Sequence, residues 1–201
     1  MGGARPAAAE PGDSPARYAI TVYYTAVETY HGGRRVEVRG CPSREGAFCR
    51  ELLGRYPRSF VRAVRAEGTG RITSGRHAGS YLNWSHDTGY WLDTIPASSY
   101  GGRLVPFRTA AADAGVLQRG VQFRLLGPLV QDDGCPLSDT VAKRLLAARW
   151  VVQDEFTPGL GGAHHLDLYI GEEDRPNFTR ESPLYMSLRG VAIRVERGGR
   201  P

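Results

Sequence analysis

The stretch of sequence that decides the fold runs from residue 150 to residue 170 and reads WVVQDEFTPGLGGAHHLDLYI. Its two ends, Trp150–Asp154 and His165–Ile170, are short and rich in β-branched and aromatic residues, which is typical of strands. The segment between them contains proline and several glycines, which is typical of a loop. The pattern therefore predicts two strands joined by a loop, with Asp154 on the first strand and Asp167 on the second.

Further short strands are predicted on both sides of this stretch. They cover Tyr18–Thr25, Val36–Arg39, Leu104–Asp113, Gly120–Leu126 and Gly190–Val195. Apolar spacing predicts one or two short helices in Gly46–Arg65, with a break at Pro57, and another helix in Pro136–Arg149. Many short strands with a few small helices favour a closed β-barrel over a layered α/β sheet.

The length of 201 residues suits one domain that carries an insertion. We expect a disordered Ala/Pro-rich lead at residues 1–16 and a single barrel domain at residues 17–198. Residues 67–102 are dense in glycine, serine, tyrosine and tryptophan, which predicts short strands and loops with exposed aromatic side chains. An insertion into the barrel is accordingly expected at about residues 40–103.

The composition argues against several partners. The formal charge of +5 comes from basic residues scattered through every segment, without the basic stripe and interleaved aromatics of a nucleic-acid-binding surface. No apolar run approaches the roughly 18 residues that a membrane span needs, so a soluble protein and a monomer are expected. Residues 1–15 lack signal-peptide architecture, but such a lead often follows a removed signal, so we expect a secreted or cell-envelope protein.

The three cysteines, Cys41, Cys49 and Cys135, lack the paired spacing of a zinc ribbon or a CxxC redox site. Cys41 and Cys49 flank a short segment that can close as a disulfide loop in an oxidising compartment, and other pairings stay open. The histidines are dispersed apart from His164 and His165, and no pair has metal-ligand spacing. We therefore expect no metal and no cofactor.

Three segments in order carry a resemblance: LVPFRTAAAD (104–113) followed by RGVQFRLLG (119–127), VVQDEFTPGLGG (151–162), and HHLDLYIG (164–171). Together they resemble the three-aspartate domain of lytic transglycosylases of the membrane-bound lytic transglycosylase A type, which is related to expansin and rare lipoprotein A barrels. The family's aspartates map onto Asp113, Asp154 and Asp167. The glycine loop departs from the family's usual Thr-Gly-Gly-Ala type, and residues 67–102 have no counterpart in it.

The resemblance implies a mainly β fold, a six-stranded double-psi β-barrel with short helices and an aromatic, glycine-rich insertion. It implies that a glycan binds in an open groove, with Asp167 as the catalytic acid/base and Asp154 beside it. It also implies that the sugar's own 6-hydroxyl attacks the cleaved carbon, which leaves a 1,6-anhydro product.

The residues themselves fit this chemistry. Cleaving a glycosidic bond needs a proton for the departing oxygen, which a carboxylic acid supplies when its pKa is raised towards working pH. Strand alternation sends Leu166 and Leu168 to the face opposite Asp167, so the rise must come from Asp154 or from groove aromatics. The alternative for Asp154 is a loop-capping role.

Other side chains are candidates for contacts with the glycan. His165 shares strand parity with Asp167, although a structural loop histidine is the more common case. Asp113 lies before Ala-Gly, where an aspartate commonly holds a turn. Flat rings stack on sugar faces, with core packing as the alternative. The predicted substrate-binding set is Asp113, His165, Tyr169, Trp84, Trp91, Tyr90 and Tyr24.

The leading hypothesis is an enzyme that cleaves a cell-wall polysaccharide such as peptidoglycan, as a lytic transglycosylase or a glycoside hydrolase. One alternative is a non-catalytic barrel that binds wall glycan as expansins do, because HLDLY also resembles their HFDL strand. A second alternative is a secreted protease inhibitor on the same barrel, in which the carboxylates would not matter.

Overall fold

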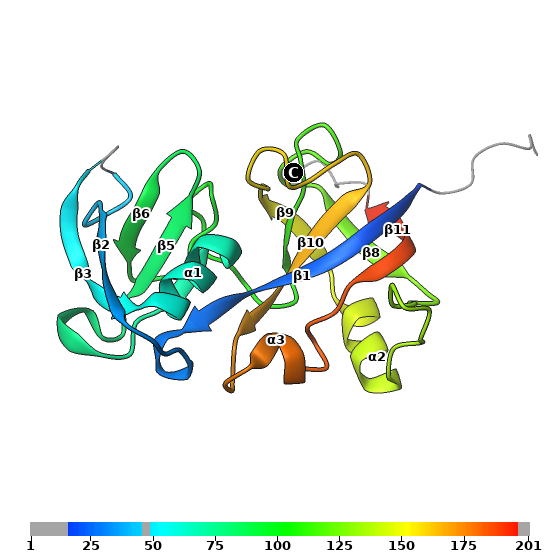
Figure 1. Ribbon diagram of the computed structural model, residues 1–201. Coiled ribbons are helices and arrows are strands. Elements are labelled where there is room, and N and C mark those ends of the chain that lie inside the picture. Colours follow the sequence, from blue (N-terminus) through cyan, green and yellow to red (C-terminus); the bar gives the residue numbers. More distant parts are fainter. Residues whose placement is uncertain (1–15, 46–48, 197–201) are drawn as a thin grey trace, which may run out of the picture.

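The computed structural model describes residues 16–45 and 49–196, and it shows two lobes side by side with strand β1 running through both (Figure 1). The predicted disordered lead lies outside the described residues except for Ala16. One lobe is a β-barrel, and the other is a smaller unit of two β-sheets and a helix. The smaller unit is called the second lobe below; it comprises residues 28–96.

The barrel consists of six strands in the order β10-β7-β9-β8-β11-β1, and it closes because β1 also pairs with β10. The prediction of a mainly β, six-stranded barrel with a few short helices is confirmed. The strands are β1 (Arg17–Val27), β7 (Thr109–Ala111), β8 (Gln122–Leu126), β9 (Trp150–Asp154), β10 (His165–Glu172) and β11 (Leu188–Glu196).

Alternation along β10 divides its side chains between the barrel core and the opposite face, because successive strand residues point to opposite sides. Leu166, Leu168 and Ile170 belong to the main core cluster. His165 and Asp167 point the other way, beside β1. The parallel pairing of β1 with β10 sets Thr21 opposite Asp167.

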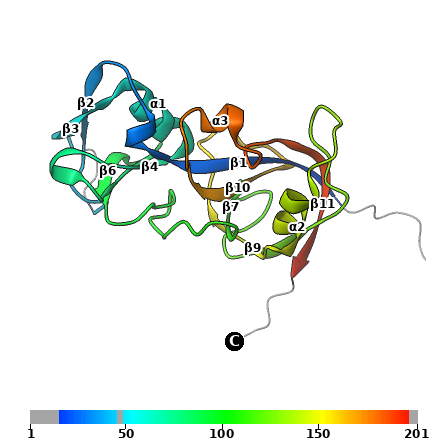
Figure 2. The same ribbon diagram turned by 90° about the horizontal axis from the view of Figure 1, so that it is seen from below.

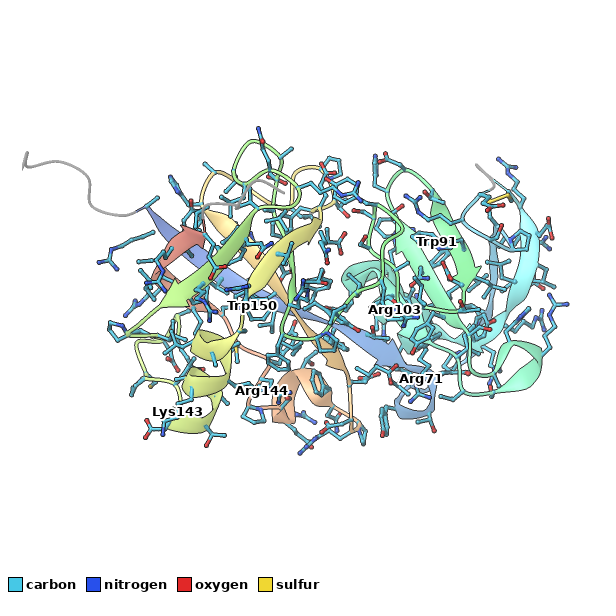
Figure 3. All side chains as sticks on the ribbon, turned by 180° about the vertical axis from the view of Figure 1, so that it is seen from behind. Arg71, Trp91, Arg103, Lys143, Arg144 and Trp150 are labelled. Carbon is cyan, nitrogen blue, oxygen red and sulfur yellow. A yellow bond between two sulfur atoms is a disulfide. The ribbon has the colours of Figure 1, made fainter. Side chains whose placement is uncertain are left out.

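Two helices and a tryptophan complete the barrel. Helix α2 (Asp139–Ala147) packs Val141 and Leu145 into the core, and the short helix α3 (Phe178–Glu181) adds Phe178. Trp150 lies fully buried among them, within the barrel (Figure 3). Burying a side chain of this size contributes several kcal/mol to the hydrophobic stabilisation of the barrel.

The second lobe grows from the far end of β1. Ala26 and Val27 pair in parallel with β4 (Thr69–Arg71), which continues antiparallel into β5 (Tyr81–Ser85) and β6 (Gly89–Asp93). Seen from below, β1 runs on from the barrel into this lobe (Figure 2). The remaining elements are η1 (Glu28–Tyr30), β2 (Arg35–Gly40), β3 (Glu51–Pro57), α1 (Arg58–Glu67) and η2 (Gly75–His77).

Helix α1 packs very closely on strand β4. The α1 side chains Phe60 and Val64 are fully buried against the strand. A Cβ atom placed on Gly70 would overlap both of them. Glycine at position 70 is therefore required for the approach of the helix to the sheet. This contact fixes the C-terminal end of α1, which carries Arg65 and Glu67.

The prediction of helix across Gly46–Arg65 was wrong for Glu51–Pro57, and its residues 46–48 lie outside the described residues. Glu51–Pro57 forms strand β3, which pairs with β2 around a bulge near Gly54. The buried residues Leu53 and Tyr56 are three positions apart, a spacing that also fits a helix. The pairing with β2 cannot be seen in a local sequence pattern. Pro57 ends the strand and occupies the N-cap position of α1, without a side-chain capping hydrogen bond.

The strand predicted at Leu104–Asp113 is also shorter than expected. Only Thr109–Ala111 pairs as β7, because residues 106–108 form a turn in which Phe107 has a φ of 57°. Near the base of the lobes, Glu172 accepts hydrogen bonds from Arg71 and Tyr81, and Glu173 accepts one from the Val27 amide. These contacts join the end of β10 to the second lobe.

Cys41 and Cys49 form a disulfide in the second lobe, and Cys135 is an exposed free cysteine. A disulfide is the form that cysteines take in an oxidising compartment. Within residues 16–45 and 49–196, no helix combines the length and the apolar character that crossing a membrane requires.

Candidate active site

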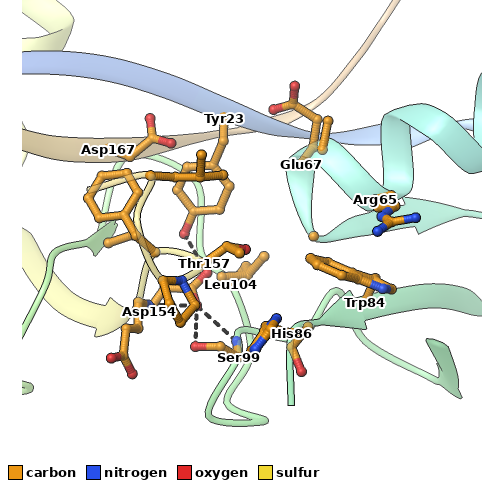
Figure 4. A pocket seen from close by; sticks show the side chains of 18 of the residues that line it. Tyr23, Arg65, Glu67, Trp84, His86, Ser99, Leu104, Asp154, Thr157 and Asp167 are labelled. Carbon is orange, nitrogen blue, oxygen red and sulfur yellow. Dashed lines mark hydrogen bonds between the residues drawn. The ribbon is translucent and has the colours of Figure 1, made fainter. Parts of the chain in front are cut away.

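A groove of about 290 Å³ lies between the two lobes, and both lobes contribute its walls. The barrel wall carries two carboxylates, Asp154 and Asp167, while the wall from the second lobe carries Arg65 and Trp84 (Figure 4). Further residues that line the groove include Thr21, Tyr23, Glu67, His86, Asp87, Ser99, Leu104, Ala111, Glu155, Phe156 and His165.

Asp154 ends strand β9 and is held by four hydrogen bonds. Its Oδ1 accepts from the Ser99 amide at 2.8 Å, from the Ser99 hydroxyl at 2.8 Å and from the Glu155 amide at 2.9 Å. Its Oδ2 accepts from the Tyr23 hydroxyl at 3.0 Å. Four donors favour the ionised form of a carboxylate and fix its orientation, so Asp154 is held rigidly at the side of the groove.

Asp167 lies on β10 within a short hydrogen-bonded chain. Thr21 Oγ1 donates to Asp167 Oδ1 at 2.8 Å, and Thr21 Oγ1 is also 2.8 Å from His165 Nε2. A threonine hydroxyl has one proton. When Asp167 is ionised, Thr21 therefore donates to Asp167 and accepts from the His165 ring, and the chain links the three side chains.

The two aspartates titrate differently because they are held differently. Burial raises the pKa of Asp167 to about 7, and the nearby Asp154 carboxylate adds to the rise, while the hydrogen bond from Thr21 opposes it. Burial also raises the pKa of Asp154, but the hydrogen bonds from Ser99, Glu155 and Tyr23 oppose that rise. Asp167 can therefore hold a proton near neutral pH beside an anionic neighbour.

Tyr23 stays a neutral donor in this site. Burial raises its pKa well above the usual value, and both Asp154 and Asp167 add to the rise because they disfavour a phenolate. Its ring packs against Tyr169 with the ring centroids 5.3 Å apart. The pair, with Leu104 and Ala111, forms a small apolar cluster next to the groove. This cluster fixes the Tyr23 hydroxyl on Asp154.

The second lobe contributes another acid at the end of α1. Glu67 lines the groove and accepts a weak hydrogen bond of 3.4 Å from the Tyr24 amide. Burial raises the pKa of Glu67 to about 8, with the Asp167 carboxylate as the next cause. At neutral pH, Glu67 is therefore mainly a neutral carboxylic acid.

The loop after Asp154 closes one end of the groove. The Asp113 carboxylate accepts a hydrogen bond of 2.8 Å from the Gly162 amide, and a Cβ on Gly161 would overlap that carboxylate. The Phe156 ring packs against His165 with centroids 4.7 Å apart. Asp113 thus holds the glycine loop from outside the groove lining.

The structure brings together only part of the predicted site set. Asp154, Asp167, His165 and Trp84 all line the groove. The five other predicted residues lie outside its lining. Asp113 holds the loop, Tyr24 is buried against Phe178, Tyr169 bonds Thr25, Tyr90 donates to the Val61 carbonyl, and Trp91 is fully buried beside Cys41 in the second lobe.

Several groove residues escaped the sequence analysis. Thr21 and Tyr23 share one face of β1, opposite to that of the predicted Tyr24, and only the pairing register with β10 sets Thr21 beside Asp167. Ser99, Arg65 and Glu67 carry no local signal, because they reach the groove through the packing of the lobes. Within the described residues, no group of three His, Cys, Asp or Glu side chains has the arrangement of a metal site.

Comparison with solved structures decides which known fold this is. The crystal structure of MltA from E. coli with bound chitohexaose matches with a TM-score of 0.58 at 13% sequence identity, over 90% of this chain and 73% of that one. The chain has the MltA fold. The resemblance predicted from the sequence is thereby confirmed, with its double-psi barrel.

Other proteins with the MltA fold match similarly. A membrane-bound lytic murein transglycosylase from Agrobacterium tumefaciens gives a TM-score of 0.54 at 13% identity, over 89% of this chain and 73% of that one. MltA from Neisseria gonorrhoeae gives 0.50 at 10% identity, over 91% and 74%. No protein-family model and no curated protein matches the sequence. At this identity, the MltA likeness concerns the fold, and activity has to be argued from the groove.

Proposed function

We propose that this protein is an exported enzyme that cleaves a cell-wall glycan of the peptidoglycan type, with Asp167 as general acid/base and Asp154 as its electrostatic partner. One observation carries the proposal: two carboxylates line one groove, one held as an anion by four donors and the other with a pKa of about 7. A protonated acid beside a fixed anion is the arrangement that glycosidic bond cleavage uses.

The mechanism follows from these two states. Protonated Asp167 gives its proton to the glycosidic oxygen as the bond from that oxygen to the sugar's anomeric carbon breaks. Positive charge develops on the ring, and the Asp154 carboxylate stabilises it across the groove. Asp167, now ionised, takes the proton from the 6-hydroxyl of the same sugar as that oxygen bonds to the anomeric carbon. The product is a 1,6-anhydro sugar, and Asp167 is again protonated.

The hydrogen-bonded chain between Thr21 of β1 and the β10 residues His165 and Asp167 supports this cycle. The Thr21 hydroxyl faces Asp167 in both charge states, because it can donate to the carboxylate and accept from the acid. His165 backs Thr21 and keeps the hydroxyl oriented. Both residues are positioning residues in this mechanism.

Export is supported by the disulfide between Cys41 and Cys49, which fits an oxidising compartment. Among the proteins of similar fold, one is a membrane-bound lytic murein transglycosylase and another was crystallised with bound chitohexaose, which supports the proposal. The proposed location is outside the cytoplasm, and the proposed partner is a polysaccharide.

The test is digestion of purified peptidoglycan followed by mass spectrometry of the soluble products. We expect fragments with 1,6-anhydro ends from the wild-type protein and none from Asp167→Asn, while Asp132→Asn, a matched exchange at an exposed position outside the groove lining, keeps full activity. Reducing ends in place of anhydro ends would make the enzyme a hydrolase. Glycan binding without any soluble product would sink the enzyme proposal and leave a binding protein.

A further inference from the structure

The wall of the groove that faces the two aspartates is built around a stacked pair, Arg65 and Trp84. The Arg65 guanidinium carbon lies 5.6 Å from the centroid of the Trp84 ring. Arg65 comes from the last turn of α1 and Trp84 from β5, and both line the groove on the side away from Asp154 and Asp167 (Figure 4). The stack holds the guanidinium in place without using its N–H groups.

Several arginines of the molecule pair with an acidic side chain, but Arg65 has no such partner among the described residues. Arg35, Arg71 and Arg124 each donate to a glutamate at 2.8 to 2.9 Å. Within residues 16–45 and 49–196, no carboxylate forms a salt bridge with Arg65, although Asp87 lines the same wall. Its hydrogen-bond donors are therefore available to a ligand in the groove.

The charges of the two walls differ. Asp154, Asp167 and Glu155 line the barrel side, whereas the side of the second lobe carries the guanidinium of Arg65, together with Asp87 and the mainly neutral Glu67. A ligand with a negative group is repelled from the first wall and attracted to the second, so the groove admits it in one orientation.

We propose that Arg65, stacked on Trp84, selects glycans that carry a carboxylate over neutral glycans of the same length. The inference rests on the proposed function, because it assumes that a glycan lies in this groove. Arg65 binds the carboxylate of a substituent on one sugar in the forked geometry that guanidinium groups favour. Trp84, which is half-buried and lines the same wall, contacts the sugar ring with the part of its side chain that faces the groove.

The selection also orients the substrate. With the carboxylate on Arg65, the opposite edge of the sugar chain faces Asp167 and Asp154. A neutral oligosaccharide such as the chitohexaose bound by a matching protein lacks this anchor. We therefore expect this chain to bind neutral chito-oligosaccharides less tightly than acidic ones.

The experiment measures binding in the Asp167→Asn background by calorimetry, so that cleavage does not interfere. The probes are a hexasaccharide of alternating N-acetylglucosamine and N-acetylmuramic acid, which carries lactyl carboxylates, and chitohexaose, which has none. We expect the acidic probe to bind about tenfold more tightly at low salt, which is the effect of one good charge-assisted contact. Because the contact is partly exposed to solvent, the preference shrinks in about 0.5 M salt.

Arg65→Gln removes the preference, and Arg65→Lys keeps part of it because the charge remains without the planar fork. Arg62→Gln is the matched control, since Arg62 is exposed on the same helix and does not line the groove. It keeps the full preference. Equal binding of the two probes by the background protein, or a preference that survives Arg65→Gln, overturns the inference.

Failure of the proposed function has a different signature. If the protein with Asp167 intact binds the acidic probe through Arg65 but releases no product, the selection stands and the enzyme proposal falls. If wild-type protein cleaves both probes at equal rates and binds them equally, the enzyme proposal stands and the selection falls.

Discussion

The barrel and the second lobe present opposite kinds of surface to the same groove. On the barrel side, Asp154 is only 8% exposed and is held by four hydrogen bonds, and Asp167 is tied to Thr21 and His165. On the side of the second lobe, Arg65 is exposed and is held only by a stacked ring. Under the proposed function, the barrel supplies the catalytic groups and the second lobe supplies recognition of the glycan.

The largest expected effect separates these two roles in kinetics. Asp167→Asn lowers kcat by roughly 10³-fold with little change in glycan binding, because a general acid/base contributes roughly 10²- to 10⁴-fold. Trp84→Ala raises KM and leaves kcat within about threefold, because the ring contacts the sugar and not the reacting atoms. Steady-state rates on soluble peptidoglycan fragments check both. A drop in kcat alone for Trp84→Ala would contradict the division between the lobes.

A second comparison uses two tryptophans of the same hairpin. Trp91 is fully buried in the second lobe, whereas Trp84 lines the groove (Figure 3, Figure 4). Trp91→Ala lowers the free energy of unfolding by about 3–5 kcal/mol, and Trp84→Ala lowers it by about 1 kcal/mol. Denaturant unfolding measures both. Similar losses would mean that Trp84 is mainly a structural residue.

A third prediction concerns the hydrogen bonds on Asp154. Tyr23→Phe removes one donor from the carboxylate, which raises the pKa of Asp154 further because that donor favoured the ionised form. Activity then falls by up to about tenfold, and it falls more at acidic pH than at neutral pH, since more Asp154 is protonated at the lower pH. The matched control is Tyr169→Phe, whose hydroxyl bonds Thr25 and not Asp154. If the acidic limb of the pH–rate profile lies at the same pH in Tyr23→Phe as in the wild type, the Tyr23 hydroxyl does not tune Asp154.

The last expected effect is on how stability depends on pH. The pKa of Asp167 is about 7 in the folded protein and about 4 in the unfolded chain, so folding becomes less favourable as pH rises from about 4 to 7. Asp167→Asn removes this cost, so its Tm exceeds that of the wild type by roughly 10 °C at pH 8 and matches it at pH 4. Thermal unfolding at the two pH values checks the difference. An equal shift at both would point to packing and not to charge.

The barrel could be predicted from the sequence because its evidence is local. β9 and β10 are short segments with β-branched, aromatic and apolar residues, and strand parity placed Asp167 and His165 on one face. Together with the other short strands they predicted a closed barrel, and the resemblance to a known domain added its double-psi type and a predicted role for Asp154.

The second lobe resisted prediction for a physical reason. The apolar spacing of β3 fits a helix until its partner β2 is known, and that pairing is a contact between segments. Trp84 and Trp91 lie on paired strands of one hairpin, yet Trp91 is fully buried and Trp84 lines the groove. Only the way the sheet packs decides between them, so residues that reach the groove by packing, such as Arg65, carried no signal.

Strand β1 has a consequence for the order of events during synthesis. Its first residues pair with β10 and β11, whose residues lie more than a hundred positions later in the chain, whereas its last two pair with β4 nearby. Contacts between close segments form sooner than contacts between distant ones. A nascent chain can therefore complete the second lobe while the barrel still lacks its closing strands β10 and β11, so the groove between the lobes is assembled last.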